Sequence, residues 1–368
     1  MVNQRIAFII TGLGMGGAET QVCSLIDQLA ARGHTILLLS LTGESVNKPK
    51  HPSVKLVELN MRKNPLGFVK AYWQAVSILR QFQPDVVHSH MVHANIFARL
   101  LRVVAPIPRL VCTAHSTNEG GKARMLAYRL TDSWCDLTTN VSQEAVEAFI
   151  TQKAVKPGRI IAQHNGIDLA KFAFNPVARE RCRTELGLNT NQTLLLAVGR
   201  LSVQKDYPNL LRAFAQLVKS QPSIRLAIIG QGELVTQIEQ MIEQLELASH
   251  VHLLGLRFDV ADWMSAADCF VLSSAWEGFG LVVAEAMACE RPVVATDCGG
   301  VREVVGDYGY LVPPCDSKKL AEALVQAMAL SPQERATLGK NARNYIESRY
   351  SLSAITEQWL KFYQRSMQ

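Results

Sequence analysis

The chain has 368 residues, of which 48% are hydrophobic and 19% charged, with a formal net charge of +6. This composition is typical of a soluble globular protein and excludes a disordered one, and the length predicts two domains. No apolar run approaches the ~18 residues of a membrane span, and a secretory signal is not expected at the N-terminus. Eight scattered cysteines without a C-x-x-C pair predict buried, reduced thiols in a cytoplasmic protein.

The first expected strand, residues 5–10, runs into the glycine cluster "GLGMGGAET". Gly12, Gly14 and Gly17 spell G-x-G-x-x-G, the fingerprint of a dinucleotide site. That site also needs an acid at the end of the second strand, ~20 residues on, to hold the ribose. Here the first acid, Glu44, lies beyond that strand in the loop. We therefore expect a ligand-facing glycine loop before a helix N-terminus, and no NAD site.

The segment 61–82, "MRKNPLGFVKAYWQAVSILRQF", mixes basic and aromatic residues and contains no acid. A basic, aromatic helix of this kind can lie on an anionic bilayer surface. The alternative is a solvated helix with Trp73 packed on the core. The aromatic residues follow no nucleic-acid-binding pattern, so no nucleic acid partner is expected.

Short apolar runs alternate with amphipathic stretches along the chain, and the pattern restarts after residue ~170. This predicts an α/β protein with two doubly wound, Rossmann-like units, each binding ligands at the carboxyl ends of its strands. The seam is expected within residues 165–181, where Gly, Pro and Asn interrupt the periodicity. The expected domains are residues 1–170, with a C-terminal helix of about 352–368, and residues 171–351.

Two constellations of the second unit point to a nucleotide diphosphate sugar. Arg200 and Lys205 follow a buried strand, where cations can neutralise a diphosphate. Glu277 and Glu285 stand eight residues apart, on either side of a loop that opens a helix. The helix N-terminus suits a phosphate, and the flanking carboxylates suit the hydroxyls of ribose and hexose.

These residues, in "GRLSVQKD" and "EGFGLVVAEAMACERPVVATDCGG", resemble the retaining family 4 glycosyltransferases with the GT-B fold. The E-x7-E pair is the hallmark of that family. Further motifs extend the resemblance over nearly the whole chain: "GLGMGGAET", "LAARGHTI", "PDVVHSH", "TAHS", "NGID" and "IIGQGEL". The resemblance implies two Rossmann-like domains facing across a cleft, with the final helix crossing back to the first domain.

The resemblance also implies the roles of individual residues. Arg200 and Lys205 would bind the donor diphosphate, Glu277 would contact the transferred sugar, and Glu285 would hold the ribose hydroxyls. In the first domain, His115 would contact the donor sugar. The remaining substrate-binding positions are implied by the same motifs: Gly14, Gly16 and Gly17 at the phosphate, Phe279, Gly280, Leu281 and Val282 at phosphate and sugar, and Gly230, Gly232 and Arg257 around the base.

His88, His90 and His93 form H-x-H-x-x-H, which could be a set of metal ligands. No acid or cysteine joins them nearby, so we expect them to line the cleft on the acceptor side. Family members generally need no divalent metal, and the chain has no D-x-D motif. The expectation is no metal and no cofactor, with Arg200 and Lys205 supplying positive charge.

The implied function is retaining transfer of a hexose from a UDP-sugar to a polyprenyl-diphosphate-linked saccharide, as in O-antigen assembly. The best expectation for the hexose is an N-acetylhexosamine such as GalNAc. The enzyme would lie in the cytoplasm, on the inner face of the inner membrane. Two alternatives stay open: a sugar-nucleotide epimerase or phosphorylase on the same fold, and a non-catalytic nucleotide-sugar-binding protein. The sequence fixes neither the donor sugar nor the acceptor nor the linkage.

Overall fold

The computed structural model describes residues 3–117 and 119–364, so residues 365–368 of the expected C-terminal helix lie outside the described part. The chain divides into two compact units, and the first is built from both ends of the sequence. Unit 1 contains residues up to Gly166 and resumes at Leu352, whereas unit 2 is the continuous stretch Ile167–Ser351.

Unit 1 contains a seven-stranded parallel sheet in the order β3-β2-β1-β4-β5-β6-β7. Its strands are β1 (Arg5–Ile10), β2 (Thr35–Ser40), β3 (Lys55–Glu58), β4 (Val86–His90), β5 (Arg109–Ala114), β6 (Leu137–Asn140) and β7 (Ile160–Ala162). Its helices are α1 (Gly17–Ala31), α2 (Pro65–Phe82), α3 (Val92–Leu101), α4 (Lys122–Thr131), α5 (Gln143–Thr151) and α14 (Leu352–Gln364), with the short 3-10 helix η1 (Asp132–Trp134).

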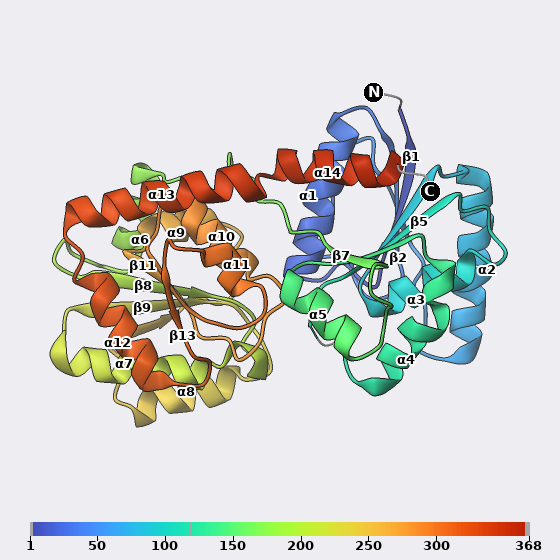
Figure 1. Ribbon diagram of the computed structural model, residues 1–368. Helices are drawn as coiled ribbons and strands as arrows, with labels where there is room; N and C mark the ends of the chain where they lie inside the picture. Colours follow the sequence, from blue (N-terminus) through green and yellow to red (C-terminus); the bar gives the residue numbers. More distant parts are fainter. Residues whose placement is uncertain (1–2, 118, 365–368) are drawn as a thin grey trace. The chain divides into compact units, whose positions relative to one another are not determined.

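Helices cover both faces of this sheet, which explains why its central strands are almost continuously apolar. Figure 1 shows α1 and α14 on one face and α2 and α3 on the other. In α14, Trp359, Leu360 and Tyr363 are buried with Phe8 of β1. The last helix of the chain is therefore part of the core that surrounds its first strand.

Unit 2 contains a six-stranded parallel sheet in the order β10-β9-β8-β11-β12-β13. Its strands are β8 (Thr193–Val198), β9 (Ile224–Ile229), β10 (Val251–Leu253), β11 (Cys269–Leu272), β12 (Val293–Thr296) and β13 (Tyr310–Val312). Its helices are α6 (Pro176–Glu185), α7 (Tyr207–Ser220), α8 (Val235–Gln244), α9 (Val260–Ala266), α10 (Leu281–Ala288), α11 (Val301–Val305), α12 (Ser317–Met328) and α13 (Pro332–Tyr350), with the 3-10 helix η2 (Val203–Lys205).

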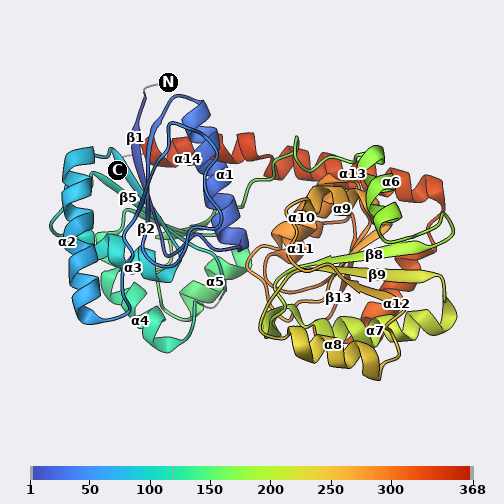
Figure 2. The same cartoon turned by 180° about the vertical axis from the view of Figure 1, so that it is seen from behind.

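In Figure 2, α7, α8 and α12 line one face of the second sheet, and α6, α9, α10 and α13 lie over the other. Both sheets are thus doubly wound, as the alternation of apolar runs predicts. All eight cysteines are free thiols, and only Cys315 is exposed, which confirms the expectation of reduced and mostly buried thiols. Among the described residues, no helix combines the length and the apolar character that crossing a bilayer requires.

Helix α2 differs from the expectation that Trp73 packs onto the core. The side chain of Trp73 is 56% exposed, and Leu66 and Val69 are also exposed. The inward face of α2 is filled instead by small and aliphatic residues such as Ala71, Ala75 and Leu79. The alternative in which Trp73 is a core residue is therefore wrong.

Candidate functional site

The candidate site of unit 2 lies where the order of its strands reverses. β8 and β11 are neighbours in the sheet, yet the chain visits β9 and β10 on one side before it returns to β11 on the other. In open α/β sheets, ligands bind at the carboxyl ends of the strands beside such a reversal.

Hydrogen bonds tie the loops after β8 and β11 together at this point. The amide of Ala275 donates to the carbonyl of Gln204 over 2.8 Å, and the Gln204 side chain donates to the carbonyl of Trp276 over 3.0 Å. The Ser273 hydroxyl donates to the Lys205 carbonyl over 2.8 Å. The two loops therefore form one rigid platform.

An ion pair between Lys205 and Glu277 stands on this platform. Lys205 Nζ lies 2.5 Å from Glu277 Oε1, and only 16% and 9% of the two side chains are exposed. The Ser274 hydroxyl donates to the same carboxylate oxygen over 2.7 Å. Because removing two charges from water is costly, the pair is weak evidence for stability. It instead holds an ammonium and a carboxylate in fixed positions for a ligand with both anionic and hydroxyl groups.

Glu285 is a buried carboxylate on α10, in the segment that follows Glu277. Only 9% of the residue is exposed, and burial raises the pKa of its carboxyl to about 7, with Lys171 acting in the opposite direction. Within residues 3–117 and 119–364, its carboxyl makes no hydrogen bond or ion pair. A buried polar group of this kind is open to the hydroxyls of a ligand.

The loop between the two glutamates leads into the N-terminus of α10. Gly280 precedes the helix with φ +84° and provides no side-chain cap, and Leu281 and Val282 form the first turn. Phe279 is buried and contacts the ring of Tyr350 edge-on, with ring centroids 5.4 Å apart. The amides of a first helical turn lack partners within the helix and favour an anion.

A second glycine loop, at Gly299 and Gly300, packs against the main chain of the Glu277 loop. Gly299 has φ +57°, and a Cβ there would overlap the carbonyl oxygen of Glu277. The amide of Gly300 donates to the Gly278 carbonyl over 3.1 Å. Only glycine permits this close approach of two main chains.

Arg200 does not join the Lys205–Glu277 pair. Its side chain is 72% exposed and lies 3.2 Å from a carboxylate oxygen of Glu233. Gly230 and Gly232 pack against the main chain of residues 199–201, which brings the loops after β8 and β9 together.

Arg257 is held by neighbouring acids and an aromatic ring. Its guanidinium bonds Asp259 over 2.7 Å and Glu185 over 3.0 Å, and it lies over the ring of Trp263. Its side chain therefore ties β10 and the following loop to α6 and α9.

In unit 1, the carboxylate of Glu19 occupies the glycine loop. A Cβ at Gly14 or Gly16 would meet the oxygens of Glu19, which lies in the first turn of α1. Burial raises the pKa of Glu19. The helix N-terminus after Gly16 and Gly17 therefore faces its own acidic side chain, and a bound phosphate would have to displace it.

His115 lies at the end of β5 and forms a hydrogen-bonded pair with His90. Nε2 of His115 lies 3.1 Å from Nδ1 of His90, and the His115 amide donates to Glu119 Oε1 over 3.0 Å. Burial lowers the pKa of His115 to about 4, and burial with the neighbouring histidines lowers that of His90. Both rings are therefore neutral near pH 7 and suited to hydrogen bonding rather than to carrying charge.

The expectation that His88, His90 and His93 together line a cleft is wrong for His88. Its ring is completely buried between the Tyr363 hydroxyl and the Thr113 hydroxyl, each 2.7 Å away, and it lies against the Trp359 ring at a tilt of 49°. His90 is also buried, whereas His93 is exposed. No group of three or more potential ligands among the described residues is arranged to hold a metal ion.

Three contributors to these sites were not found from the sequence. Ser274 orients Glu277, Glu19 fills the glycine loop, and His90 pairs with His115. The serine three residues before Glu277 and the acid in "GGAE" are visible in the sequence, but neither has a spacing that is specific for its role. The histidine pair depends on the register of two neighbouring strands.

Comparisons with known proteins agree with this geometry. The family described as "Glycosyl transferases group 1" matches residues 178–345, and "Glycosyltransferase Family 4" matches residues 15–171. A D-inositol 3-phosphate glycosyltransferase of Saccharomonospora viridis is 30% identical over 311 residues, which are 77% of this chain and 70% of the relative.

Two further relatives carry names that mention lipid-linked sugars. The Escherichia coli UDP-Gal:alpha-D-GlcNAc-diphosphoundecaprenol alpha-1,3-galactosyltransferase is 27% identical, with 77% of this chain and 76% of the relative covered. A Campylobacter jejuni N-acetylgalactosamine-N,N'-diacetylbacillosaminyl-diphospho-undecaprenol 4-alpha-N-acetylgalactosaminyltransferase is also 27% identical, with coverage of 87% and 89%. Anabaena HepE in complex with UDP and glucose has the same fold, with a TM-score of 0.86, 24% identity and coverage of 98% and 99%.

The raised pKa of Glu285 predicts a pH-dependent gain in stability on Glu285→Gln. The folded-state pKa of about 7 lies above the ordinary value of 4.5, so the wild type loses stability as pH rises through this interval. The glutamine variant should gain about 2–3 kcal/mol near pH 8 but less than ~1 kcal/mol near pH 5. Thermal or urea unfolding at both pH values measures this, with exposed Glu239→Gln on α8 as control. Equal gains at the two pH values would contradict the buried-acid interpretation.

The close approach at Gly299 predicts a larger cost for Gly299→Ala than for Gly187→Ala. Both glycines have positive φ, but a Cβ at Gly187 has no heavy atom within 4 Å. Both variants carry the backbone strain of about 1 kcal/mol, and Gly299→Ala should lose a further ~1–3 kcal/mol through overlap with the Glu277 carbonyl. Urea unfolding compares the two, and equal losses would show that the two loops do not constrain each other.

Proposed function

Because the chain belongs to the group 1 glycosyltransferases with the GT-B fold, we propose that it moves a hexose from a UDP-sugar to an acceptor hydroxyl with retention at the anomeric carbon. The observation that carries the proposal is the Lys205–Glu277 ion pair at the strand reversal of unit 2, with buried Glu285 on the following helix.

The proposed roles follow from the charge and position of each group. Lys205 stabilises the diphosphate as the bond to the sugar breaks, and the amides at the start of α10 add partial positive charge. Glu277 accepts hydrogen bonds from hydroxyls of the transferred sugar, while Ser274 and Lys205 keep its carboxylate oriented. Glu285 accepts from the ribose hydroxyls in its ionised form. Arg200, exposed beside Glu233, supplements the positive charge at the diphosphate.

In the proposed reaction, the acceptor oxygen attacks the anomeric carbon from the face that the diphosphate leaves. The new glycosidic bond forms as the bond from carbon to diphosphate oxygen breaks, and the acceptor proton passes to the departing diphosphate. His115, neutral and paired with His90, contacts the donor sugar. We expect this chemistry to need no divalent metal, since the chain's own cations and amides face the leaving group.

A polyprenyl-diphosphate-linked saccharide is the proposed acceptor, in the assembly of a surface polysaccharide such as O-antigen. The names of two relatives support this class, and the Campylobacter relative supports an N-acetylhexosamine such as GalNAc as the transferred sugar. The proposed location is the cytoplasmic face of the inner membrane. Exposed Leu66, Val69 and Trp73 fall on one stripe of α2, with Lys63 and Lys70 beside them, which suits an anionic bilayer.

Glu277→Gln should separate catalysis from nucleotide binding. The glutamine side chain has nearly the same shape as glutamate and can still accept from Ser274, but it lacks the negative charge. The rate of transfer should therefore fall about 10²–10³-fold. UDP affinity should remain within severalfold, whereas Lys205→Met should weaken UDP binding about tenfold or more. Transfer is measured with a panel of UDP- and GDP-sugars and short lipid-diphosphate acceptors, with and without chelator, and UDP binding by calorimetry.

Glu239→Gln and Lys318→Met, on exposed helix faces, are matched controls for that experiment. Full transfer activity in Glu277→Gln would contradict its role. Formation of an epimer or sugar phosphate from UDP-hexose alone would show one of the alternative activities. Loss of activity with chelator, restored by Mg²⁺ or Mn²⁺, would overturn metal independence.

The double variant Lys63→Glu/Lys70→Glu should weaken binding to anionic vesicles about tenfold or more, because each basic residue near such a surface contributes about 1 kcal/mol. Arg80 is left unchanged because its guanidinium donates to the Val104 carbonyl over 3.0 Å. Sedimentation with phosphatidylglycerol vesicles measures the binding, and Lys318→Glu/Lys340→Glu in unit 2 matches the charge change. Unaltered binding in the α2 variant would refute docking through this helix.

A further inference from the structure

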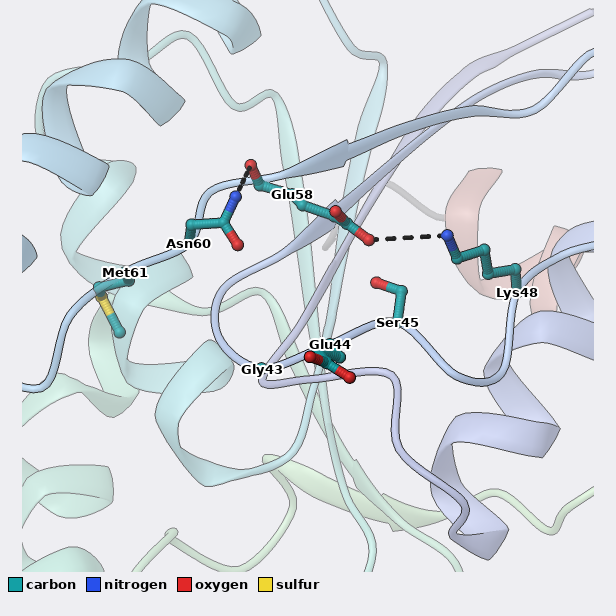
Figure 3. A pocket seen from close by; sticks show the side chains of 7 residues that line it. All are labelled: Gly43, Glu44, Ser45, Lys48, Glu58, Asn60 and Met61. Atoms are coloured by element: carbon teal, nitrogen blue, oxygen red, sulfur yellow. Dashed lines mark hydrogen bonds and ion pairs between the residues drawn. The ribbon is translucent and has the colours of Figure 1, made fainter.

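A cavity of about 470 Å³ opens in unit 1 at the carboxyl ends of β2 and β3. Its volume falls within the range of small-molecule sites. Figure 3 shows the residues that line it: Gly43, Glu44, Ser45, Lys48, Glu58, Asn60 and Met61.

The cavity contains a buried hydroxyl with no partner. Ser45 Oγ is inaccessible to solvent and makes no hydrogen bond within the described part of the chain. In Figure 3 it points toward the side of the cavity that holds the Glu58 carboxylate. An unpaired buried hydroxyl costs free energy, and a ligand that offers it a hydrogen bond removes that cost.

The charges around the cavity favour hydroxyl groups over anions. Glu44 and Glu58 contribute two carboxylates, and Lys48 contributes one ammonium, 3.9 Å from Glu58. The carboxylates can each accept from neighbouring hydroxyls, the ammonium and the amide of Asn60 can donate, and Met61 offers an apolar contact. A phosphate or a uronic acid would meet a net negative lining.

Main-chain hydrogen bonds join this cavity to the glycine loop. The amides of Val46 and Asn47 both donate to the Leu13 carbonyl, over 2.8 and 3.0 Å, and the Thr42 amide donates to Thr11 over 2.9 Å. The wall of the cavity and the loop after β1 therefore form one unit.

A dinucleotide does not fit this arrangement, although its ribose would lie near the end of β2. Its pyrophosphate would need the N-terminus of α1, where the Glu19 carboxylate already lies against Gly14 and Gly16. The site therefore offers groups for a diol but repels the phosphates of a dinucleotide.

We propose that this cavity binds a neutral sugar ring of the acceptor saccharide. Its assignment to the acceptor rests on the proposed function, whereas binding of a neutral sugar does not. Glu58 and Glu44 accept from ring hydroxyls, and rotation of the Ser45 side chain into the cavity lets its hydroxyl pair with a sugar oxygen. The uncharged ring lies beside the glycine loop, and the lipid diphosphate remains outside the cavity.

Saturation-transfer NMR on the full chain, with methyl glycosides of glucose, galactose and their 2-acetamido analogues as probes, tests the proposal. At least one neutral glycoside should bind in the millimolar range. Glu58→Gln should raise its Kd about tenfold, and Ser45→Ala should raise it severalfold. Glu147→Gln, on exposed α5 at the other edge of the sheet, should leave the Kd unchanged, and UDP affinity should be the same in all variants.

Several results would overturn the proposal. These are no binding of any neutral glycoside, an unchanged Kd in Glu58→Gln, or tighter binding of glucuronate, a sugar phosphate or NAD than of the neutral sugars. The outcome is separable from that of the proposed function. If the protein binds sugar in a way that depends on Glu58 but has no transfer activity, only the transferase proposal is contradicted. If it has transfer activity but no such sugar binding, only the cavity proposal is contradicted.

Discussion

The reversal of strand order between β8 and β11 is the constraint on which the site in unit 2 depends. After β8 the chain continues to one side of the sheet, and after β11 it continues to the other side. The loops that follow these two neighbouring strands therefore do not cross over the sheet between them, and their side chains are available for a ligand. The loops are then joined by main-chain and side-chain hydrogen bonds, and Lys205 and Glu277 are fixed within this framework. Gly280 is needed for its positive φ of +84°, and Gly299 is needed because a Cβ there would overlap the main chain of Glu277.

In both units, the positive groups at the candidate sites are paired with carboxylates, and the buried histidines are neutral. Lys205 is already matched by Glu277, Arg200 by Glu233, and the N-terminus of α1 by Glu19. His90 and His115 are uncharged near pH 7 because burial lowers the pKa of each ring. Substrate groups that enter these sites exchange partners with existing interactions, which favours ligands that satisfy every displaced group at once.

The sequence predicted the two doubly wound sheets and the burial of Glu285 because these depend on local patterns. Apolar runs of strand length identify buried parallel strands, and Val282, Val283 and Ala284 beside Glu285 indicate an apolar environment. His88 could not be placed in the same way. Because side chains alternate along a strand, His88 and His90 lie on the same face of β4. The helix that covers His88 is α14, whose Tyr363 lies 275 residues later in the chain. The exposure of Trp73 was equally undetermined, since an amphipathic helix with aromatic residues suits a core or a membrane surface.

The discontinuity of unit 1 has a consequence for the order in which the protein forms during synthesis. Phe8 and Ile10 of the first strand share a hydrophobic core with Trp359, Leu360 and Tyr363, which the ribosome makes after unit 2. Unit 2 is a continuous segment and has all its strands before those residues exist. The part of the nascent N-terminal sheet that α14 covers therefore stays exposed beside α1 throughout translation of unit 2, a period in which chaperone binding has a defined surface to protect. The domain that begins first is completed last.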